Sequence, residues 1–286
     1  MQYIPVYGRF IGGVNIRQAL KRCRGGVAGS GGGAGAWIPI FDRAKEGNTS
    51  QAEVLKSVGH ILEDVAGIKA AKAIGGFYAL KGSTFAFERK NVSHIYKIAR
   101  EVNLAGMDLI LDAETSDQTS VEDYYADTLA NSDVRFYKTY QMYRIDTLSR
   151  LIDDLDAGII TRFKLVRGAY CSFERDRGML MPSKKHVDHV YDAAVKYLLG
   201  EIMRGKDIHV MIATHNKASI EKALSVLGGV GGVEGQRVYF AKLLGMGDDV
   251  KGVKTMCRYV PYGPLMESLP YLGRRLIENY SILKSS

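Results

Sequence analysis

The sequence predicts an α/β protein folded as a (β/α)8 TIM-like barrel, and three observations favour this fold class. Eight short apolar runs of strand length follow one another along the chain, and stretches with the apolar spacing of amphipathic helices separate them. The chain of 286 residues also suits one barrel of this kind. A doubly wound open sheet is the alternative, but such a sheet usually ends at about five or six strands.

The first four strands are predicted over residues 36–42, 74–81, 107–111 and 134–140. Helical stripes of apolar residues lie between them. The first stripe has intervals of four, three and four residues, which place its members on one face of a helix: Val54, Val58, Ile61 and Val65. A further helix is expected over residues 119–131.

The second half of the chain continues the alternation. Strands are predicted over residues 163–166, 208–213, 238–244 and 257–260. Helices are expected around 187–198, over 217–227 and over about 265–280, so the chain ends in a helix that follows the eighth strand.

Basic residues are concentrated in the amino-terminal part of the chain. The net charge is +8, and residues 1–41 contain five Lys or Arg and no Asp or Glu. We expect residues 1–35 to form a basic, glycine-rich arm and residues 36–286 to form the barrel. An acid-free arm is typical of organelle-targeting segments. A nucleic-acid-binding face would instead place Lys and Arg among aromatic residues on the folded body, so no nucleic acid is expected as a partner.

Other classes of protein are disfavoured. The chain has no run of 18 apolar residues, so no membrane-spanning helix is expected. Three widely separated cysteines fit neither a disulfide framework nor a four-cysteine metal site, and they suggest a reducing compartment. His186 and His189 have the spacing of metal ligands, but no nearby carboxylate completes a set, so no metal is expected.

Polar residues cluster at the predicted carboxyl ends of the strands. In a barrel, active residues lie at these ends and in the loops that follow them. We expect the following residues to face one mouth: Lys81 after the second strand, Asp112 after the third, Lys138 in the fourth, Arg167 to Tyr170 after the fifth, Thr214 to Asn216 after the sixth, and Tyr259 in the eighth.

The last predicted helix carries four polar residues on one face. Tyr271, Arg274, Arg275 and Glu278 lie at i, i+3, i+4 and i+7. Two adjacent guanidinium groups form a permanently charged fork that suits a carboxylate. A solvated pair between Arg275 and Glu278 is the alternative. Together with the charged residues at the strand ends, the helix favours a carboxylate-binding site.

The sequence resembles the proline dehydrogenase family, in particular the mitochondrial type found in eukaryotes. The resemblance runs from about residue 74 to the end of the chain, and several motifs in the right order carry it. They are KLVRGAY at 164–170, ATHN at 213–216, LLGMGD at 243–248 and RYVPYGPLMESLPYLGRRLIEN at 258–279, supported by DAE at 112–114 and TYQ at 139–141.

The resemblance implies a distorted (β/α)8 barrel with non-covalently bound FAD and with its last helix over the barrel mouth. It implies oxidation of L-proline to Δ1-pyrroline-5-carboxylate, with a hydride moving from proline Cδ to flavin N5. Electrons would pass to ubiquinone, with peripheral association at the matrix side of the mitochondrial inner membrane. In a prokaryote the protein would be cytoplasmic.

The resemblance also implies roles for individual residues. Lys81, Arg274 and Arg275 would bind the proline carboxylate, and Asp112 would hold this charged cluster in place. Leu165, Tyr259 and Tyr271 would line the space around the pyrrolidine ring, with Tyr170 near the flavin. FAD would be contacted by Lys138, Lys164, Val166, Arg167, Gly168, Ala169, Tyr170, Ala213, Thr214, His215, Asn216, Arg275 and Glu278.

Two related functions stay open at this stage. Hydroxyproline dehydrogenase is one, although Tyr259 is expected to crowd the ring hydroxyl and therefore favours proline. A non-catalytic relative that binds FAD or proline is the other, because Lys138 and Lys242 depart from the family's usual residues. Lys138 either stabilises the reduced flavin by its charge or points away from it.

Overall fold

Eight parallel strands close into a barrel in the order in which they occur in the chain, and β8 pairs with β1. The structure is a computed structural model, and it describes residues 10–28, 37–45, 47–71, 75–228, 237–246, 252–253, 256–269 and 273. The strands are β1 (Ile38–Arg43), β2 (Phe77–Lys81), β3 (Asp108–Asp112), β4 (Phe136–Gln141), β5 (Arg162–Val166), β6 (His209–Ala213), β7 (Val238–Leu243) and β8 (Met256–Tyr262).

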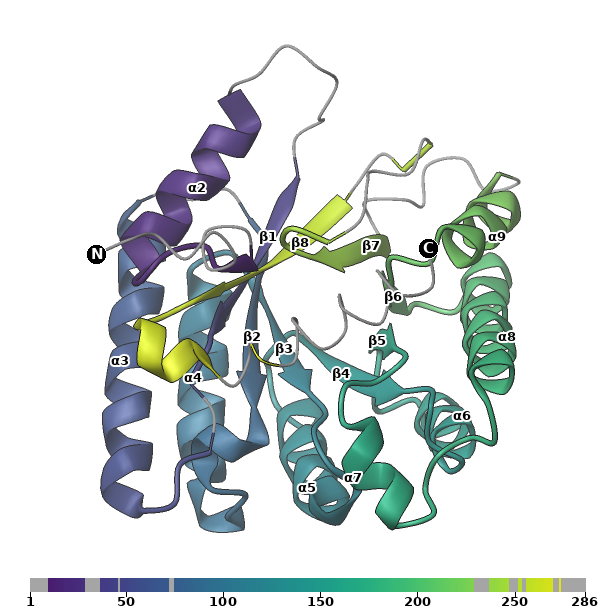
Figure 1. Cartoon of the computed structure of the whole chain (residues 1–286), viewed down its shortest axis with the longest axis horizontal. Coiled ribbons are helices and arrows are strands. Elements are labelled where there is room, and N and C mark those ends of the chain that lie inside the picture. Colours follow the sequence, from purple (N-terminus) through teal and green to yellow (C-terminus); the bar gives the residue numbers. More distant parts are fainter. Residues whose placement is uncertain are drawn as a thin grey trace.

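Helices surround the barrel, as Figure 1 shows for α3 to α6, α8 and α9. The α-helices are α2 (Ile16–Ala28), α3 (Gln51–Ala70), α4 (Val92–Leu104), α5 (Thr119–Ala130), α6 (Thr147–Ala157), α7 (Cys171–Asp176), α8 (Lys184–Met203) and α9 (Lys217–Leu227). Short 3-10 helices are η1 (Gly82–Phe85), η2 (Arg89–Asn91) and η3 (Ser116–Gln118).

The sequence of α3 explains where the helix begins and which of its faces is buried. Ser50 caps its first turn, because the Ser50 hydroxyl accepts the Glu53 N–H and the Glu53 carboxylate accepts the Ser50 N–H. The apolar stripe that includes Val54, Ile61 and Val65 is buried against the barrel. The helix therefore begins and packs as its sequence predicts.

Side chains along each strand alternate between the barrel interior and the layer beneath the helices. Ile40, Ala79 and Ile110 belong to the inner cluster, whereas their neighbours Phe41 and Leu109 pack in the outer core. The same alternation, continued toward the carboxyl ends, turns the last polar residues of several strands into the mouth. This geometry positions the candidate site.

The segment before β1 packs onto the barrel. Gly12 N donates to Pro261 O at 2.7 Å and Gly263 N donates to Gly13 O at 3.0 Å, beside the end of β8. A Cβ on Gly12 would lie 2.4 Å from Val260 Cγ1, so this close approach requires glycine. Apolar residues of α2 also join the outer core.

The predicted fold class is confirmed, and the closure of β8 onto β1 excludes the doubly wound alternative. Each predicted strand lies within three residues of its observed bounds. The final helix is observed over 265–269 and at residue 273. The rest of it lies outside the described residues, as do residues 1–9 and 29–35 of the predicted arm. Among the described helices, none has the length and apolarity needed to span a membrane.

Candidate active site

Asp112 is the centre of a buried charged cluster inside the barrel mouth. It ends β3 and faces inward. Lys164 Nζ donates to Asp112 Oδ1 at 2.6 Å, and the Tyr259 hydroxyl donates to Oδ2 at 2.5 Å. Thr139 Oγ1 donates to Oδ1 at 3.3 Å, and the Lys164 ammonium lies 5.1 Å from the centre of the Tyr259 ring. Strands β3, β4, β5 and β8 thus meet at one carboxylate.

Lys81 adds a second ammonium group to this cluster. It ends β2 and its Nζ lies 2.6 Å from Asp42 Oδ1, with both side chains less than a tenth exposed. Burial alone would raise the pKa of Asp112. The charges of Lys164 and Lys81 outweigh burial, together with the hydrogen bonds to Asp112, and lower that pKa below its ordinary value. Asp112 is therefore a carboxylate at neutral pH.

The guanidinium of Arg167, just after β5, is held from three sides. It donates to Asp188 Oδ1 at 2.7 Å, to Thr214 Oγ1 at 2.6 Å and to Ser219 Oγ at 3.0 Å. It also lies 4.4 Å from the centre of the Tyr191 ring. These contacts fix the end of β5 against β6, α8 and α9.

Gly168 follows Arg167 in a backbone conformation that favours glycine, with φ of +132°. Tyr143 packs directly against it, since a Cβ at Gly168 would lie 1.3 Å from Tyr143 Cε1. Tyr170 then leads into α7, half-buried. The absence of a side chain at Gly168 therefore allows this loop to lie against the loop after β4.

The end of β6 leads directly into α9. Thr214 is buried, and its hydroxyl accepts the Asn216 N–H at 3.0 Å as well as the Arg167 bond. Asn216 caps α9 by accepting the Ser219 N–H at 3.3 Å. His215 is exposed. Lys164, Val166 and Ala213 face the interior below these loops, as their alternation with outward residues requires.

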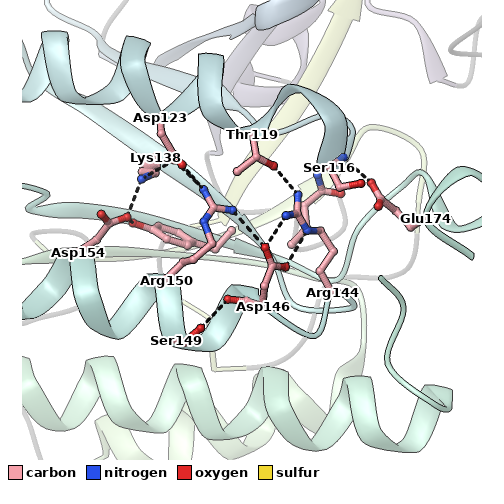
Figure 2. Close-up of polar contacts among 12 residues, drawn as sticks. Ser116, Thr119, Asp123, Lys138, Arg144, Asp146, Ser149, Arg150, Asp154 and Glu174 are labelled. Carbon is pink, nitrogen blue, oxygen red and sulfur yellow. Dashed lines mark hydrogen bonds and ion pairs between the residues drawn. The ribbon is translucent and has the colours of Figure 1, made fainter. Parts of the chain in front are cut away.

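Two expected site residues point away from the mouth, and this corrects their predicted placement. Leu165 lies between the inward-facing Lys164 and Val166, and its side chain is fully buried in the outer core. Lys138 likewise alternates with the inward-facing Thr139. Its Nζ lies 2.6 Å from Asp154 Oδ2 and 3.0 Å from Asp123 Oδ1. Figure 2 shows these three residues in contact. Lys138 therefore links β4 to α5 and α6.

The contacts of Lys138 with Asp123 and Asp154 belong to a larger network of charged side chains outside the barrel (Figure 2). Arg150 donates to both oxygens of Asp123, at 2.6 and 2.8 Å. Arg144 donates to both oxygens of Asp146, at 2.9 and 2.6 Å, and to Thr119. Acidic and basic groups balance one another here, which is typical of a structural network.

A second buried acidic side chain, Glu122, supports the loop after β3. The Glu114 N–H donates to Glu122 Oε1 at 2.8 Å, the Glu114 carboxylate accepts the Ser83 N–H at 2.7 Å, and its carbonyl accepts Gln141 Nε2 at 2.6 Å. Burial raises the pKa of Glu122 to about 8, and the hydrogen bond from Glu114 and the charges of two arginines offset only part of that. Glu122 therefore carries its proton at neutral pH.

Four expected site residues of the last helix lie outside the described residues: Tyr271, Arg274, Arg275 and Glu278. Two residues near the mouth were not anticipated. Asp42 is signalled only by its place at the end of the first strand, and Tyr143 by its position just beyond the TYQ motif. Within the described ranges, no three His, Cys, Asp or Glu side chains are arranged to hold a metal ion.

Comparison with known families decides the relationship. A family model described as "Proline dehydrogenase" matches residues 35–286. The chain belongs to the proline dehydrogenase family. This match covers every strand of the barrel and each residue of the Asp112 cluster.

Curated members of the proline dehydrogenase family are about 31% identical to the chain over the stretches that align. Human "Proline dehydrogenase 1, mitochondrial" is 31% identical over 210 residues, which are 66% of this chain and 35% of the relative. Human "Hydroxyproline dehydrogenase" is 31% identical over 225 residues, which are 69% of this chain and 48% of the relative. The chain thus spans between a third and a half of the length of these relatives.

Solved structures share the barrel of this proline dehydrogenase family member. Proline utilization A (PutA) from Bdellovibrio bacteriovorus, inactivated by N-propargylglycine, has a TM-score of 0.79 at 20% identity, covering 96% of this chain and 32% of PutA. A PutA structure with proline bound in remote sites has a TM-score of 0.75 at 24% identity, covering 96% of this chain and 31% of PutA. At these identities the likeness concerns the fold.

Proposed function

We propose that the protein is an FAD-dependent proline dehydrogenase that oxidises L-proline to Δ1-pyrroline-5-carboxylate. The buried cluster of Lys81, Asp112, Lys164 and Tyr259 is the observation that supports this most strongly. It lies at the carboxyl ends of the strands, where barrel enzymes place their chemistry, in a chain of the proline dehydrogenase family.

The residues at the ends of β5 and β6 are compatible with FAD. Gly168 offers a backbone surface without a side chain, Arg167 is fixed beside it, and Asn216 places the N-terminus of α9 next to the mouth. Helix N-termini and cations suit a pyrophosphate group. The proposed contacts are Lys164, Val166, Arg167, Gly168, Ala169, Tyr170, Ala213, Thr214, His215 and Asn216, with Arg275 and Glu278 from the last helix.

The chain's own residues would bind and orient the substrate. Lys81, Arg274 and Arg275 would hold the proline carboxylate, and Tyr259 and Tyr271 would wall the pyrrolidine ring. Asp112 fixes the Tyr259 hydroxyl, so the ring would meet a wall held in one position. A water-poor site also favours the neutral amine that must be present when hydride leaves Cδ. FAD, when bound, accepts this hydride.

One experiment tests cofactor, substrate and reaction class together. The purified protein should be yellow, and adding L-proline without oxygen should bleach its visible absorption because the flavin becomes reduced. A colourless protein that takes up no added FAD, or a yellow one that proline does not bleach, would contradict the proposal.

The carboxylate-binding role has its own test. The variant Arg275→Met should raise the half-saturating concentration of proline by about a hundredfold or more and leave the flavin bound, because a charged hydrogen-bonding partner is lost. Steady-state kinetics measure the first effect and the flavin spectrum the second. Unchanged proline kinetics would refute the role of Arg275.

Hydroxyproline oxidation is the second candidate, because hydroxyproline dehydrogenases from human and cattle are 31% and 30% identical to the chain. The Tyr259 ring, fixed by Asp112, supports proline over the hydroxylated ring because it leaves less space for an added hydroxyl. Catalytic efficiencies on L-proline and trans-4-hydroxy-L-proline decide between them, and a higher value for hydroxyproline would favour the second candidate.

Electron transfer to ubiquinone and a mitochondrial location complete the proposal. The names of the human and bovine relatives include mitochondrial, and the acid-free arm is consistent with such targeting. Bacterial PutA structures share the fold, so cytoplasmic location applies if the chain is prokaryotic. Fractionation of cells that produce the protein, followed by assay with ubiquinone, tests both statements.

A further inference from the structure

Asp42 lies near the end of β1, on the same strand face as Ile38 and Ile40, and turns into the barrel. Ile40 belongs to the inner cluster and Phe41 to the outer core, so the alternation of the strand directs Asp42 inward. The residue is 2% exposed. A buried carboxylate at the mouth needs a partner, because burying a lone charge is costly.

Lys81 supplies that partner at 2.6 Å from Asp42 Oδ1. β1 and β2 are neighbouring strands in register, with Asp42 opposite Ala79. The Lys81 side chain begins two residues further along β2 and extends to the Asp42 carboxylate. A small cavity lined by Asp42, Lys81 and Thr84 borders the pair.

The charges of the described cluster come in pairs. Lys164 is hydrogen-bonded to Asp112, whose other oxygen accepts Tyr259. Asp42 makes the corresponding contact to Lys81, while Asp112 acts on Lys81 only through its charge. Asp42 therefore holds the Lys81 ammonium by a direct ion pair at the mouth.

We propose that Asp42 is a positioning residue of the active site, which fixes the Lys81 ammonium in the place and charge state needed to receive a substrate carboxylate. The substrate part of this inference rests on the proposed function. Two substitutions separate the effects of Asp42: one removes its charge, and the other keeps the charge but moves it.

The effect of the Asp42 charge on Lys81 is tested by the chemical reactivity of the Lys81 amine. Acetic anhydride acetylates only the neutral amine, and mass spectrometry of the digested full-length protein measures the extent at each lysine. At pH 8, Lys81 in Asp42→Asn should react at least about tenfold faster than in wild type, because an opposite charge in contact shifts a pKa by about 1–3 units. Lys164, still paired with Asp112, serves as the internal reference and should react as in wild type.

Asp64→Asn is the matched control. Asp64 is also a buried carboxylate beside a cation, 3.0 Å from Arg43, but it lies on α3 outside the barrel. This variant should leave Lys81 reactivity within about twofold of wild type. Equal Lys81 reactivity in Asp42→Asn and wild type, or an equal rise in the control, would overturn the proposal.

The position is tested by Asp42→Glu, which keeps the charge and moves it by one methylene. Lys81 acetylation should stay close to wild type, while KM for L-proline should rise about tenfold with kcat little changed, since misplacement weakens binding steeply. An unchanged KM in a variant that oxidises proline would refute positioning. Loss of proline oxidation in wild type, with the acetylation result intact, would refute the proposed substrate and leave the Asp42–Lys81 assignment standing.

Discussion

The protonated carboxyl of Glu122 gives a stability prediction whose sign and size follow from the structure. The pKa of Glu122 is about 8 in the folded protein and ordinarily 4.5. The folded chain therefore binds a proton that the unfolded chain releases between these values, so folding loses stability as pH rises from about 4.5 to 8. At pH 7 this costs about 3 kcal/mol, since each pH unit above the unfolded value contributes about 1.4 kcal/mol.

The substitution Glu122→Gln should remove this cost. Glutamine keeps an oxygen that accepts the Glu114 N–H, has nearly the same volume and does not titrate. Urea unfolding should show the variant more stable than wild type by about 3 kcal/mol at pH 7, with the difference shrinking below about 1 kcal/mol at pH 5.

A matched control separates this effect from a general one. Glu63 is exposed on α3, and Glu63→Gln should change the unfolding free energy by less than about 0.5 kcal/mol at either pH. If Glu122→Gln destabilises the protein equally at both values of pH, Glu122 is ionised in the fold, and the reasoning from its burial is wrong.

Two further substitutions test the mouth and its outer support. Gly168→Ala should lower the free energy of unfolding in urea by at least about 3 kcal/mol, because the added methyl group overlaps Tyr143. Gly178→Ala is the control: Gly178 also has positive φ but has open space around it, so this variant should lose about 1 kcal/mol. Equal losses in the two variants would contradict the close packing of Gly168 against Tyr143. Lys138→Gln should cost about 2 kcal/mol, because two part-buried carboxylates each lose one of their partners, and should leave the flavin midpoint potential unchanged. A lower potential with unchanged stability would place the Lys138 ammonium at the flavin instead.

The barrel could be predicted from sequence because each strand is a separate apolar run between helical stripes. Strand ends then indicated the mouth, since all parallel strands point their carboxyl ends the same way. Lys81 and Asp112 end their strands, Tyr259 lies in the middle of β8, and all three polar side chains face inward.

The direction of individual side chains could not be predicted in the same way. All six residues of β4 are buried, so burial gives no sign of which of them face the interior. Lys138 and Leu165 stand next to inward-facing residues and consequently face outward. Asp42 follows an apolar run and lies outside the motifs that carry the family resemblance, so only its place at the end of the first strand points to the mouth.

The closure of β8 onto β1 has a consequence for how a nascent chain matures. Tyr259 reaches Asp112 across 147 positions of sequence, so a ribosome must deliver nearly the whole barrel before that bond can form. Before β8 is synthesised, the edge of β1 that it covers has no strand to pair with. Unpaired strand edges promote association with other chains, so the incomplete barrel is prone to aggregate. The pairing that covers this edge therefore becomes available only after β8 has been synthesised.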